Sequence, residues 1–429
     1  MTDNFDPRAL TEQARTLRRA ARVLARQSTA ARDDALNCMA RALRAHSAPI
    51  LDANAADVER ATSRQLEDAF IDRLILSESR IESMAAAIDE IATLDDPIGG
   101  QDQTWTRPNG LRVARRRIPL GVIGMIYESR PNVTSDAAAL CLKSGNGILL
   151  KGGSDAFRSN RAIVDALREG IEDSALDDAA AQALGFVDTT DRQAVQTMLG
   201  LSESIDVIIP RGGKGLIQFV NQHSQIPVIK HDEGVCHVVV DGSASAEDVD
   251  RIVLNAKVQR PGVCNALETL LVLRSAVDHH LPRLLKKLAD EDVEFHLCPT
   301  SAEVAKDVGI EHFFRADDKA YAAEFLSLQL AVRVVDNLDE AIAHIDRFGS
   351  RHTEAIVTND YAQSQRFLDE VDSSVVLVNA STRFSDGGQL GLGAEIGIST
   401  TRMHAYGPMG LRELTTTKFV VLGSGQARE

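Results

Sequence analysis

The chain contains few cysteines and no residue spacing that is typical of a metal site. Five cysteines, an odd number, are scattered over its 429 residues, at Cys38, Cys141, Cys236, Cys264 and Cys298. They are too few for the disulfide framework of a small secreted domain, so we expect reduced thiols and a cytoplasmic location. No C-x-x-C or H-x-x-x-H pair is present, and we therefore expect no bound metal.

The chain also lacks a long apolar run and an excess of basic residues. Its N-terminus has no apolar core of the signal-peptide kind, and no stretch reaches transmembrane length. Its 47 Lys and Arg residues are outnumbered by 62 Asp and Glu residues, which gives a net charge of −15. Binding to nucleic acid or to an anionic membrane requires a basic surface, so we expect neither partner. The charge does not argue against small anionic ligands, because these need only local positive groups.

The order of the patterns along the chain predicts more than one domain. With 429 residues, 44% of them hydrophobic, we expect two or three domains with sizeable cores. The N-terminal region, up to about residue 100, repeats apolar side chains at helical spacing. Residues 104–119 alternate around a Pro-Asn-Gly turn at 108–110, which predicts a β-hairpin. From Leu120 onward, strands and helices alternate in two blocks, the second starting at Cys236, which predicts parallel sheets covered by helices. The tail is again strand-like.

The G-x-G-x-x-G fingerprint of many dinucleotide-binding folds is absent. Its nearest substitute is "PRGGKGLI", residues 210–217, in which Gly212, Gly213 and Gly215 follow a strand and precede a helix. Such a loop binds phosphate through free backbone N–H groups, although a simple glycine-rich turn explains the pattern equally well. Lys151 ends another strand beside two glycines, where a lysine either contacts a ribose or phosphate or is simply solvated.

Cys264 stands in the stretch "QRPGVCNALETLL", residues 259–271. The helical pattern ends before Pro261, which lacks an N–H and disfavours helix at the residue before it. Gly262 then allows a sharp turn, so we expect Cys264 on a tight loop that opens into a strand. There its N–H could point at a reacting oxygen and its thiolate could act as a nucleophile. A small buried core residue is the alternative, and these local features leave both open.

Longer motifs make the chain similar to one enzyme family. They are "GVIGMIYESRPNVTSDAAALCLKSGN", "VIIPRGGKGLI", "PVIKHDEGVCHVVVD", "NAKVQRPGVCNALETLLV", "HTEAIVT", "VNASTRFSDGGQLGLGAEIGISTTRMHAYGPMGL" and "ELTTTKFVV". The resemblance extends from the N-terminal helical region to the C-terminal strand. The sequence resembles the glutamate-5-semialdehyde dehydrogenases, also called gamma-glutamyl phosphate reductases, which form the proline-biosynthesis branch of the aldehyde dehydrogenase superfamily.

The resemblance implies an aldehyde dehydrogenase-like α/β fold, with two α/β domains, a cleft between them and a small β oligomerisation element. The NADP-binding domain would comprise residues 1–103 and 120–238, and the catalytic domain residues 239–407. The oligomerisation element would comprise residues 104–119 and 408–429. The resemblance also accounts for the missing glycine fingerprint, because this superfamily binds its dinucleotide without one.

The implied activity is the NADPH-dependent reduction of L-glutamyl 5-phosphate to L-glutamate 5-semialdehyde and phosphate through a cysteine thioester. This is the second step of proline biosynthesis from glutamate. The resemblance further implies a homo-oligomer, with glutamate 5-kinase as a functional partner that supplies the unstable acyl phosphate.

The resemblance also assigns roles to individual residues. Cys264 is the nucleophile, and its N–H together with the side-chain amide of Asn132 would stabilise the oxyanion. Ser154 stands where NAD-preferring relatives often hold an acid, which leaves room for a 2′-phosphate beside Lys151. The full set of cofactor contacts implied is Lys151, Ser154, Arg211, Gly212, Gly213, Gly215 and Glu324. The candidates for binding the substrate's phosphate or α-carboxylate, each of which could instead be structural, are Arg130, Asn379, Ser381, Thr382 and Arg383.

One departure from the superfamily pattern bears on the reaction. The glutamate that activates water in oxidative aldehyde dehydrogenases falls at His231 here, with Asp232 and Glu233 just after it. Losing that base suits a reductase, whose thioester should not be hydrolysed, although Asp232 or Glu233 could still act as a base. Three other readings remain at this point: a cysteine hydrolase or acyltransferase without a nicotinamide, an oxidative aldehyde dehydrogenase, and a relative without activity.

Overall fold

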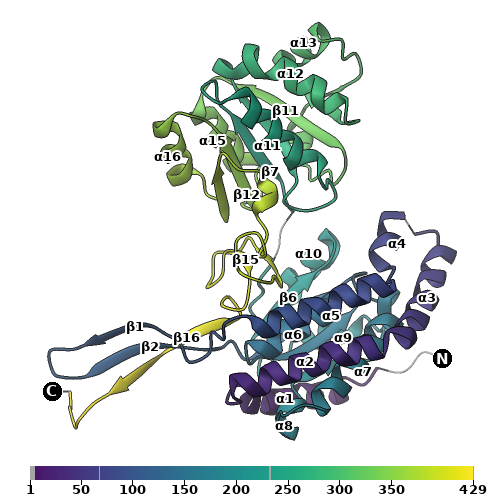
Figure 1. Cartoon of the computed structure of the whole chain (residues 1–429), viewed down its shortest axis with the longest axis vertical. Helices are drawn as coiled ribbons and strands as arrows, with labels where there is room; N and C mark the ends of the chain where they lie inside the picture. Colours follow the sequence, from purple (N-terminus) through teal and green to yellow (C-terminus); the bar gives the residue numbers. More distant parts are fainter. Residues whose placement is uncertain (1–4, 67, 231–232, 429) are drawn as a thin grey trace.

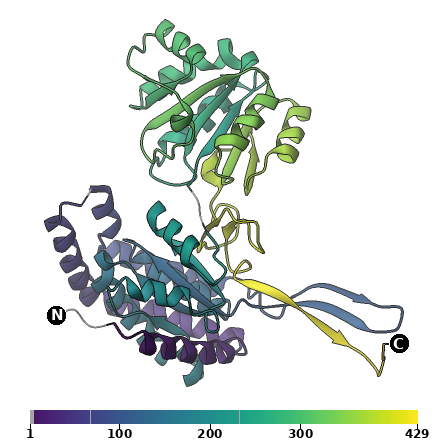
Figure 2. The same cartoon turned by 180° about the vertical axis from the view of Figure 1, so that it is seen from behind.

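Two parallel β-sheets form the cores of two lobes, and a third, antiparallel sheet projects from the molecule as an arm (Figure 1). The computed structural model describes residues 5–66, 68–230 and 233–428. Viewed from behind, the arm again extends to one side, away from both lobes (Figure 2). The α/β architecture with two sheet-containing lobes confirms the fold class that the sequence predicts.

The N-terminal region folds into helices, as its helical spacing predicts. These are α1 (Pro7–Leu24), α2 (Thr29–Ala45), α3 (Ser47–Ser63), α4 (Asp68–Leu74) and α5 (Glu78–Thr93). Asp6 caps α1 by accepting a hydrogen bond from the N–H of Arg8 at 2.8 Å. Leu10, Leu17 and Leu24 then recur every seven residues on the buried face of α1. Among the helices that the structure describes, none is both long enough and apolar enough to cross a membrane.

The first lobe is built on a four-stranded sheet. Its elements are β3 (Val122–Tyr127), β4 (Gly147–Gly152), β5 (Leu184–Phe186), β6 (Val207–Arg211), α6 (Asn132–Lys143), η1 (Ser154–Ala156), α7 (Phe157–Glu172), α8 (Asp178–Ala181), α9 (Gln193–Leu199) and α10 (Lys214–His223). The strands run parallel in the order β5-β4-β3-β6. Helices α1, α9 and α10 cover one face and α2, α5, α6 and α7 the other. Because both faces are covered, β3 and β4 are buried along their whole length.

The second lobe is built on a seven-stranded sheet, in the order β10-β9-β11-β8-β7-β12-β13 with all neighbours parallel. Its strands are β7 (Cys236–Val240), β8 (Leu267–Leu273), β9 (Glu294–Leu297), β10 (Phe314–Arg315), β11 (Gln329–Val335), β12 (Thr353–Val357) and β13 (Val375–Val378). Its helices are α11 (Ala246–Val258), η2 (Arg274–Ala276), α12 (Val277–Ala289), α13 (Pro299–Asp307), α14 (Asp318–Tyr321), α15 (Leu338–Phe348), α16 (Tyr361–Glu370) and η3 (Thr382–Phe384). Strand β7 belongs wholly to this sheet, so the domain boundary expected at 238/239 falls inside a strand of the second lobe.

After β13 the chain returns toward the first lobe. This segment contains the short antiparallel pair β14 (Gly397–Ser399) and β15 (Gly407–Met409), which lies between the two lobes in Figure 1. Ile396 and Met409 pack into the core of the first lobe. The two lobes are therefore joined by this returning segment as well as by the chain that leads into β7.

The arm is the predicted hairpin extended by the predicted C-terminal strand. It consists of β1 (Gln101–Thr106), β2 (Arg112–Pro119) and β16 (Thr415–Leu422), all antiparallel. Gly110 closes the hairpin with a φ of 85°, a conformation that favours glycine. Trp105 and Phe419 are exposed on the arm, and their rings meet edge to face at 6.3 Å.

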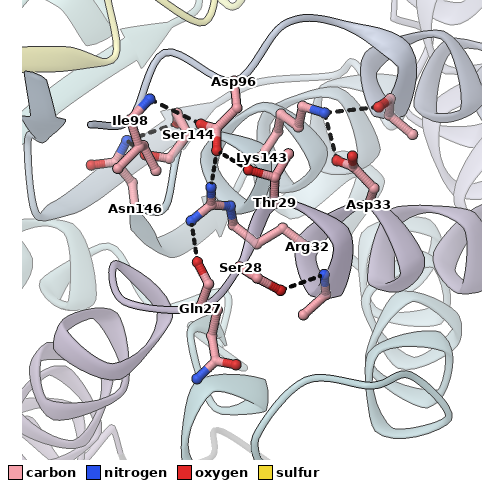
Figure 3. A network of polar contacts seen from close by, with 12 residues as sticks. Gln27, Ser28, Thr29, Arg32, Asp33, Asp96, Ile98, Lys143, Ser144 and Asn146 are labelled. Carbon is pink, nitrogen blue, oxygen red and sulfur yellow. Dashed lines mark hydrogen bonds and ion pairs between the residues drawn. The ribbon is translucent and has the colours of Figure 1, made fainter. Parts of the chain in front are cut away.

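A buried polar network fixes the root of the arm to the helices (Figure 3). Arg32 on α2, 1% exposed, forms an ion pair with Asp96, which follows α5. The other oxygen of Asp96 accepts the N–H of Ile98 at 2.9 Å, three residues before β1 begins. The ammonium of Lys143 on α6 pairs with Asp33 and donates to a backbone carbonyl at the end of α5. Breaking a buried ion pair leaves an unpaired charge, so this network should keep the segment that leads into β1 fixed against α2.

Candidate active site

A cleft of about 1280 Å³ lies between the two lobes and contains the predicted nucleophile. The first lobe contributes residues that follow the carboxyl ends of β3 and β6, which is where parallel α/β sheets usually bind ligands. The second lobe contributes residues that precede the amino ends of β7, β8, β11 and β12. The cleft therefore joins the edges of two sheets, and groups far apart in the sequence can act on one ligand.

The cleft is locally basic although the whole chain is acidic. Among the described residues, nine Arg and Lys residues line it against five Asp and Glu residues, whereas the chain carries a net charge of −15. The basic residues are Arg73, Arg130, Arg211, Lys214, Lys230, Arg260, Arg351, Arg383 and Arg402. The acidic residues are Glu128, Glu233, Glu324, Asp386 and Glu395. A cationic cleft in an anionic protein concentrates small anionic ligands.

Cys264 lies on the loop between α11 and β8, as Pro261 and Gly262 predict. The loop is half-buried and is packed against the chain that enters β7. A Cβ on Gly234 would lie 1.9 Å from the carbonyl oxygen of Cys264, so this close approach requires glycine. The thiol of Cys236 donates to the same carbonyl at 3.2 Å. These contacts fix the backbone of Cys264 while its side chain lines the cleft.

The surroundings of Cys264 oppose its ionisation in part and favour it in part. The pKa of its thiol is raised to about 11, chiefly by burial and also by Glu395 and Glu324, although the positive charge of Arg211 lowers it in part. Arg130 also lowers it. The thiolate is the nucleophilic form, so Arg211 is the strongest group in the described cleft that favours the reactive state.

We predict that alkylation of Cys264 by iodoacetamide accelerates about tenfold per pH unit between pH 7 and 10, because the thiolate fraction rises at this rate below the pKa. Replacing Arg211 with glutamine should slow alkylation at each pH, since it removes a charge that stabilises the thiolate. Mass spectrometry of the labelled peptide gives the rates. Cys264→Ser is the labelling control, and equal rates in wild type and Arg211→Gln would contradict the prediction.

The loop after β3 brings Arg130 to the cleft but directs Asn132 into its own helix. The pKa of Arg130 is lowered to about 10, chiefly by shielding from water and also by the neighbouring positive charges of Arg211 and Arg73. Asn132 is the first residue of α6, and its amide donates to a carboxylate oxygen of Asp136 at 3.0 Å. Among the described residues lining the cleft, Arg130 is present and Asn132 is not.

The predicted phosphate loop lies at the N-terminus of α10, directly after β6. Gly213 caps this helix, and its N–H donates to the carboxylate of Glu128 at 2.9 Å. A Cβ on Gly212 would lie 2.5 Å from the same carboxylate, whereas one on Gly215 would meet no atom within 4 Å. A carboxylate thus rests on the helix N-terminus, which supports the interpretation of this loop as an anion site.

Lys151 and Ser154 follow one another at the end of β4. Lys151 is buried, its ammonium donates to the carbonyl of Gly152 at 2.9 Å, and burial lowers its pKa to about 8. Ser154 begins η1 and is exposed, and its carbonyl accepts a hydrogen bond from Arg60 of α3. Neither residue is among the described residues that line the cleft, so their role in cofactor binding stays a prediction.

Glu324 reaches the cleft from the segment between α14 and β11. Its carboxylate accepts the N–H of Gly234 at 2.9 Å, which brings it to the segment that packs on Cys264. Burial raises the pKa of Glu324. Glu233, one of the alternative bases, forms an ion pair with Lys214 at 3.0 Å. The other positions considered for a base, His231 and Asp232, lie outside the described residues.

The predicted substrate-binding segment after β13 divides into two parts. Asn379 exchanges hydrogen bonds of 2.8 and 2.9 Å with the backbone of Thr358 and ties the ends of two strands together. Ser381 accepts the N–H of Arg383 at 3.3 Å, and Thr382 is fully buried. Of the predicted residues in this segment, the described cleft lining includes Arg383.

Several cleft residues were missed by the sequence reasoning: Arg73, Glu128, Arg260, Asn265, Ser385, Asp386 and Glu395. Arg260 and Asn265 lie close to Cys264 within residues 259–271, so their position near the nucleophile was an available signal. Ser385 and Asp386 belong to a Ser-Asp-Gly-Gly turn, which composition alone marks only as a loop. Within the described parts of the chain, no group of three or more His, Cys, Asp or Glu side chains could hold a metal ion.

Known proteins match this chain over nearly its whole length, and a family model matches most of it. The model of the aldehyde dehydrogenase family matches residues 5–301. The chain is 53% identical to the gamma-glutamyl phosphate reductase of Geobacter metallireducens over 98% of this chain and 100% of that protein. It is 54% identical to that of Geotalea daltonii, over 96% and 97%. The crystal structure of gamma-glutamyl phosphate reductase from Thermotoga maritima superposes with a TM-score of 0.94, at 44% identity, over 98% of this chain and 100% of that one.

Proposed function

The chain belongs to the aldehyde dehydrogenase family, whose members use nicotinamide cofactors, and within it to the gamma-glutamyl phosphate reductases, and we propose that it reduces L-glutamyl 5-phosphate with NADPH. The products are L-glutamate 5-semialdehyde and inorganic phosphate, and the step is the second in proline biosynthesis from glutamate. The observation that carries this proposal is the position of Cys264 on a cationic cleft, opposite a helix N-terminus that already holds a carboxylate.

The acyl-transfer step follows from the groups around Cys264. Its thiolate attacks the γ-carbonyl carbon, a carbon–sulfur bond forms, and the bond from this carbon to the phosphate oxygen breaks. Phosphate leaves as an anion, which Arg130 and Arg211 would stabilise because both lie close enough to influence the thiol. The N–H of Cys264 would donate to the oxyanion. We keep Asn132 as the second donor, which requires its amide to leave Asp136.

The first lobe would hold most parts of a dinucleotide, and Glu324 of the second lobe would hold one. The backbone at Gly212 and Gly213 would hold the pyrophosphate once Glu128 moves away, Lys151 and Ser154 would contact the adenosine ribose and its 2′-phosphate, and Glu324 the nicotinamide ribose. When bound, NADPH supplies the hydride that reduces the thioester. The helix N-terminus and the close approach at Gly212 fit this assignment, because both already accommodate an anionic group.

Hydrolysis of the thioester would waste the acyl phosphate, and the cleft should suppress it. Glu233 is held by Lys214 in an ion pair, which leaves its carboxylate poorly placed to activate water. We therefore expect phosphate rather than water to be the second reactant in the reverse direction.

The reverse reaction provides the test of the function. Purified protein should reduce NADP with L-glutamate 5-semialdehyde only when phosphate or arsenate is present. Turnover without phosphate would identify an oxidative aldehyde dehydrogenase instead. Thioester or ester hydrolysis without any NADP reduction would identify a hydrolase.

We predict that Ser154→Glu shifts the cofactor preference toward NADH. A carboxylate here would repel the 2′-phosphate of NADPH and could accept from the 2′-hydroxyl of NADH, so the kcat/KM ratio of NADPH to NADH should fall about tenfold to a hundredfold. Ser154→Ala removes the hydroxyl without adding charge and should change the ratio much less. An unchanged ratio in Ser154→Glu would place the 2′-phosphate elsewhere.

We also propose that the arm joins copies of this chain into a homo-oligomer. Trp105, Phe419 and Val421 are exposed apolar side chains on the arm, and an apolar face of this kind usually marks an interaction surface. We predict that Phe419→Glu lowers the mass measured by light scattering toward that of one chain. Thr416→Glu adds the same charge on the opposite face of β16 and should leave the mass unchanged. A wild-type mass for Phe419→Glu would contradict an interface on this face.

Two further expectations accompany this function. The five cysteines are all free, which suits the reducing cytoplasm. The acyl phosphate is labile, so we expect glutamate 5-kinase, the enzyme that forms it, to act as a functional partner.

A further inference from the structure

The two walls of the cleft beside Cys264 carry different kinds of charge. On the first lobe, Arg73, Arg130 and Arg211 lie close enough for the charges of Arg73 and Arg211 to lower the pKa of Arg130. Such a cluster of like charges suits a ligand group that carries more than one negative charge, such as a phosphate. Glu128 also lines this wall, but its carboxylate accepts the N–H of Gly213 at 2.9 Å, so the wall as a whole favours an anionic ligand group over a cationic one.

The wall on the second lobe combines cations with acceptors. Arg383 is half-buried, and its charge interacts with those of Arg260, Asp386 and Cys264. Its Nε donates to the side chain of Gln259 at 2.8 Å, which fixes the guanidinium beside the Cys264 loop. An arginine next to a carboxylate is complementary to a zwitterion rather than to a simple anion.

Two buried side chains on this wall have polar atoms without a partner. Asn265 is 5% exposed and Ser385 fully buried, and both line the cleft. The amide nitrogen of Asn265 donates to the carbonyl of Ser385 at 2.9 Å, so the two residues are in direct contact. In the described part of the chain, the Oδ1 of Asn265 and the Oγ of Ser385 have no hydrogen-bond partner. A buried acceptor without a donor is destabilising, and a ligand that brings a donor removes this penalty.

The geometry points to Asn265, Ser385, Arg383 and Asp386 as the subsite that binds the amino-acid end of the substrate. This inference rests on the proposed function, because it assumes glutamyl phosphate as the ligand. The α-ammonium group donates to Asn265 Oδ1, Ser385 Oγ and the Asp386 carboxylate. The α-carboxylate pairs with Arg383. The phosphate at the other end of the molecule then faces the arginine cluster of the first lobe.

This arrangement also explains how the reacting carbon is positioned. Asn265 directly follows Cys264, so an ammonium group held by its side chain lies beside the nucleophile's own loop. Binding both ends of a short, flexible substrate restricts the carbonyl carbon between them, which raises the probability of attack. The subsite would thus favour an acyl phosphate that carries an α-ammonium and an α-carboxylate group over one that lacks them.

Three aldehydes in the phosphate-dependent reduction of NADP test this subsite. They are L-glutamate 5-semialdehyde, 5-oxopentanoate, which lacks the amino group, and 4-aminobutanal, which lacks the carboxylate. Ser385→Ala should lower kcat/KM for the semialdehyde about tenfold or more and leave 5-oxopentanoate within about twofold. Arg383→Ala should lower kcat/KM about a hundredfold for the semialdehyde and for 5-oxopentanoate, which both carry the carboxylate. It should change kcat/KM for 4-aminobutanal by less than about twofold. Where turnover of an analogue is too slow, its inhibition constant against the semialdehyde is measured instead.

The controls separate the possible failures. Gln389→Ala changes an exposed side chain on the same turn and should behave as wild type with every aldehyde. Equal losses of Ser385→Ala with the semialdehyde and 5-oxopentanoate would show a merely structural role and overturn the subsite, as would no loss at all. If Arg383→Ala lowered kcat/KM for 4-aminobutanal as much as for the two carboxylate-bearing aldehydes, this would likewise overturn the subsite. Failure of the proposed function looks different, because the wild-type protein would then reduce no NADP with any of the three.

Discussion

Cys264→Ala is expected to lower kcat for phosphate-dependent NADP reduction at least about 10⁴-fold, because the acyl group then has no nucleophile to bind. The side chain lies on the cleft wall and its backbone is held by Gly234 and Cys236. Loss of one sulfur should therefore leave the fold and the first lobe intact. NADPH binding, followed by the change in its fluorescence, should stay close to that of wild type.

A second alanine variant of a cysteine distinguishes chemistry from packing. Cys141 is fully buried on α6 in the core of the first lobe, away from the cleft lining. Cys141→Ala should cost some stability but retain most activity. Full activity in Cys264→Ala would contradict the nucleophile assignment, whatever the effect of Cys141→Ala.

Lys257→Met is expected to lower the free energy of unfolding by about 3–5 kcal/mol, because it leaves the buried carboxylate of Glu268 without its partner. Lys257 on α11 and Glu268 on β8 are both fully buried, with 2.7 Å between ammonium and carboxylate. The ammonium also donates to the carbonyl of Leu267 at 2.8 Å, and Glu268 accepts the N–H of Leu326 at 3.2 Å. The pair therefore ties together the elements on either side of the Cys264 loop. Urea unfolding followed by far-UV circular dichroism measures the loss.

The loss of unfolding free energy in Lys257→Met should grow as the pH rises. Burial already raises the pKa of Glu268 to about 7, and removing Lys257 raises it further. Between the pKa of an unfolded glutamate and this raised value, the folded variant holds a proton that the unfolded chain has released. Its stability therefore falls as the pH rises, by about 1.4 kcal/mol per pH unit. The difference in the free energy of unfolding between Lys257→Met and wild type should be larger at pH 8 than at pH 7.

Replacing both partners provides the control for this pair. Lys257→Met combined with Glu268→Leu removes the charges together and fills the space with apolar atoms, so it should recover most of the stability. A double variant as unstable as Lys257→Met alone would show that lost packing, rather than an unpaired charge, causes the effect.

Short-range signals in the sequence predicted the local structure well. The alternation on both sides of the turn at 108–110 predicted the hairpin, and Gly110 adopts the positive φ that the turn needs. Pro261 and Gly262 predicted the loop that carries Cys264. These features are decided by backbone sterics and by apolar periodicity over a few residues, so neighbouring positions are enough to reveal them.

The partners within the cleft could not be predicted in this way. Arg130 and Cys264 are separated by 134 positions, and Cys264 and Arg383 by 119, and only the approach of two sheet edges brings them together. The same holds for Glu128, which the structure places on the N-terminus of α10. A chain with a net charge of −15 gives no sign that its cleft is basic.

The sequence by itself therefore determined the elements, the loop of the nucleophile and, through its long motifs, the family. The tertiary structure decided which groups surround the thiol, which polar atoms are buried without a partner, and that Asn265 and Ser385 meet. The physical reason is that pKa shifts, ion pairs and unsatisfied hydrogen bonds depend on burial and on distance through space. Both quantities are set by the packing of segments far apart in the chain.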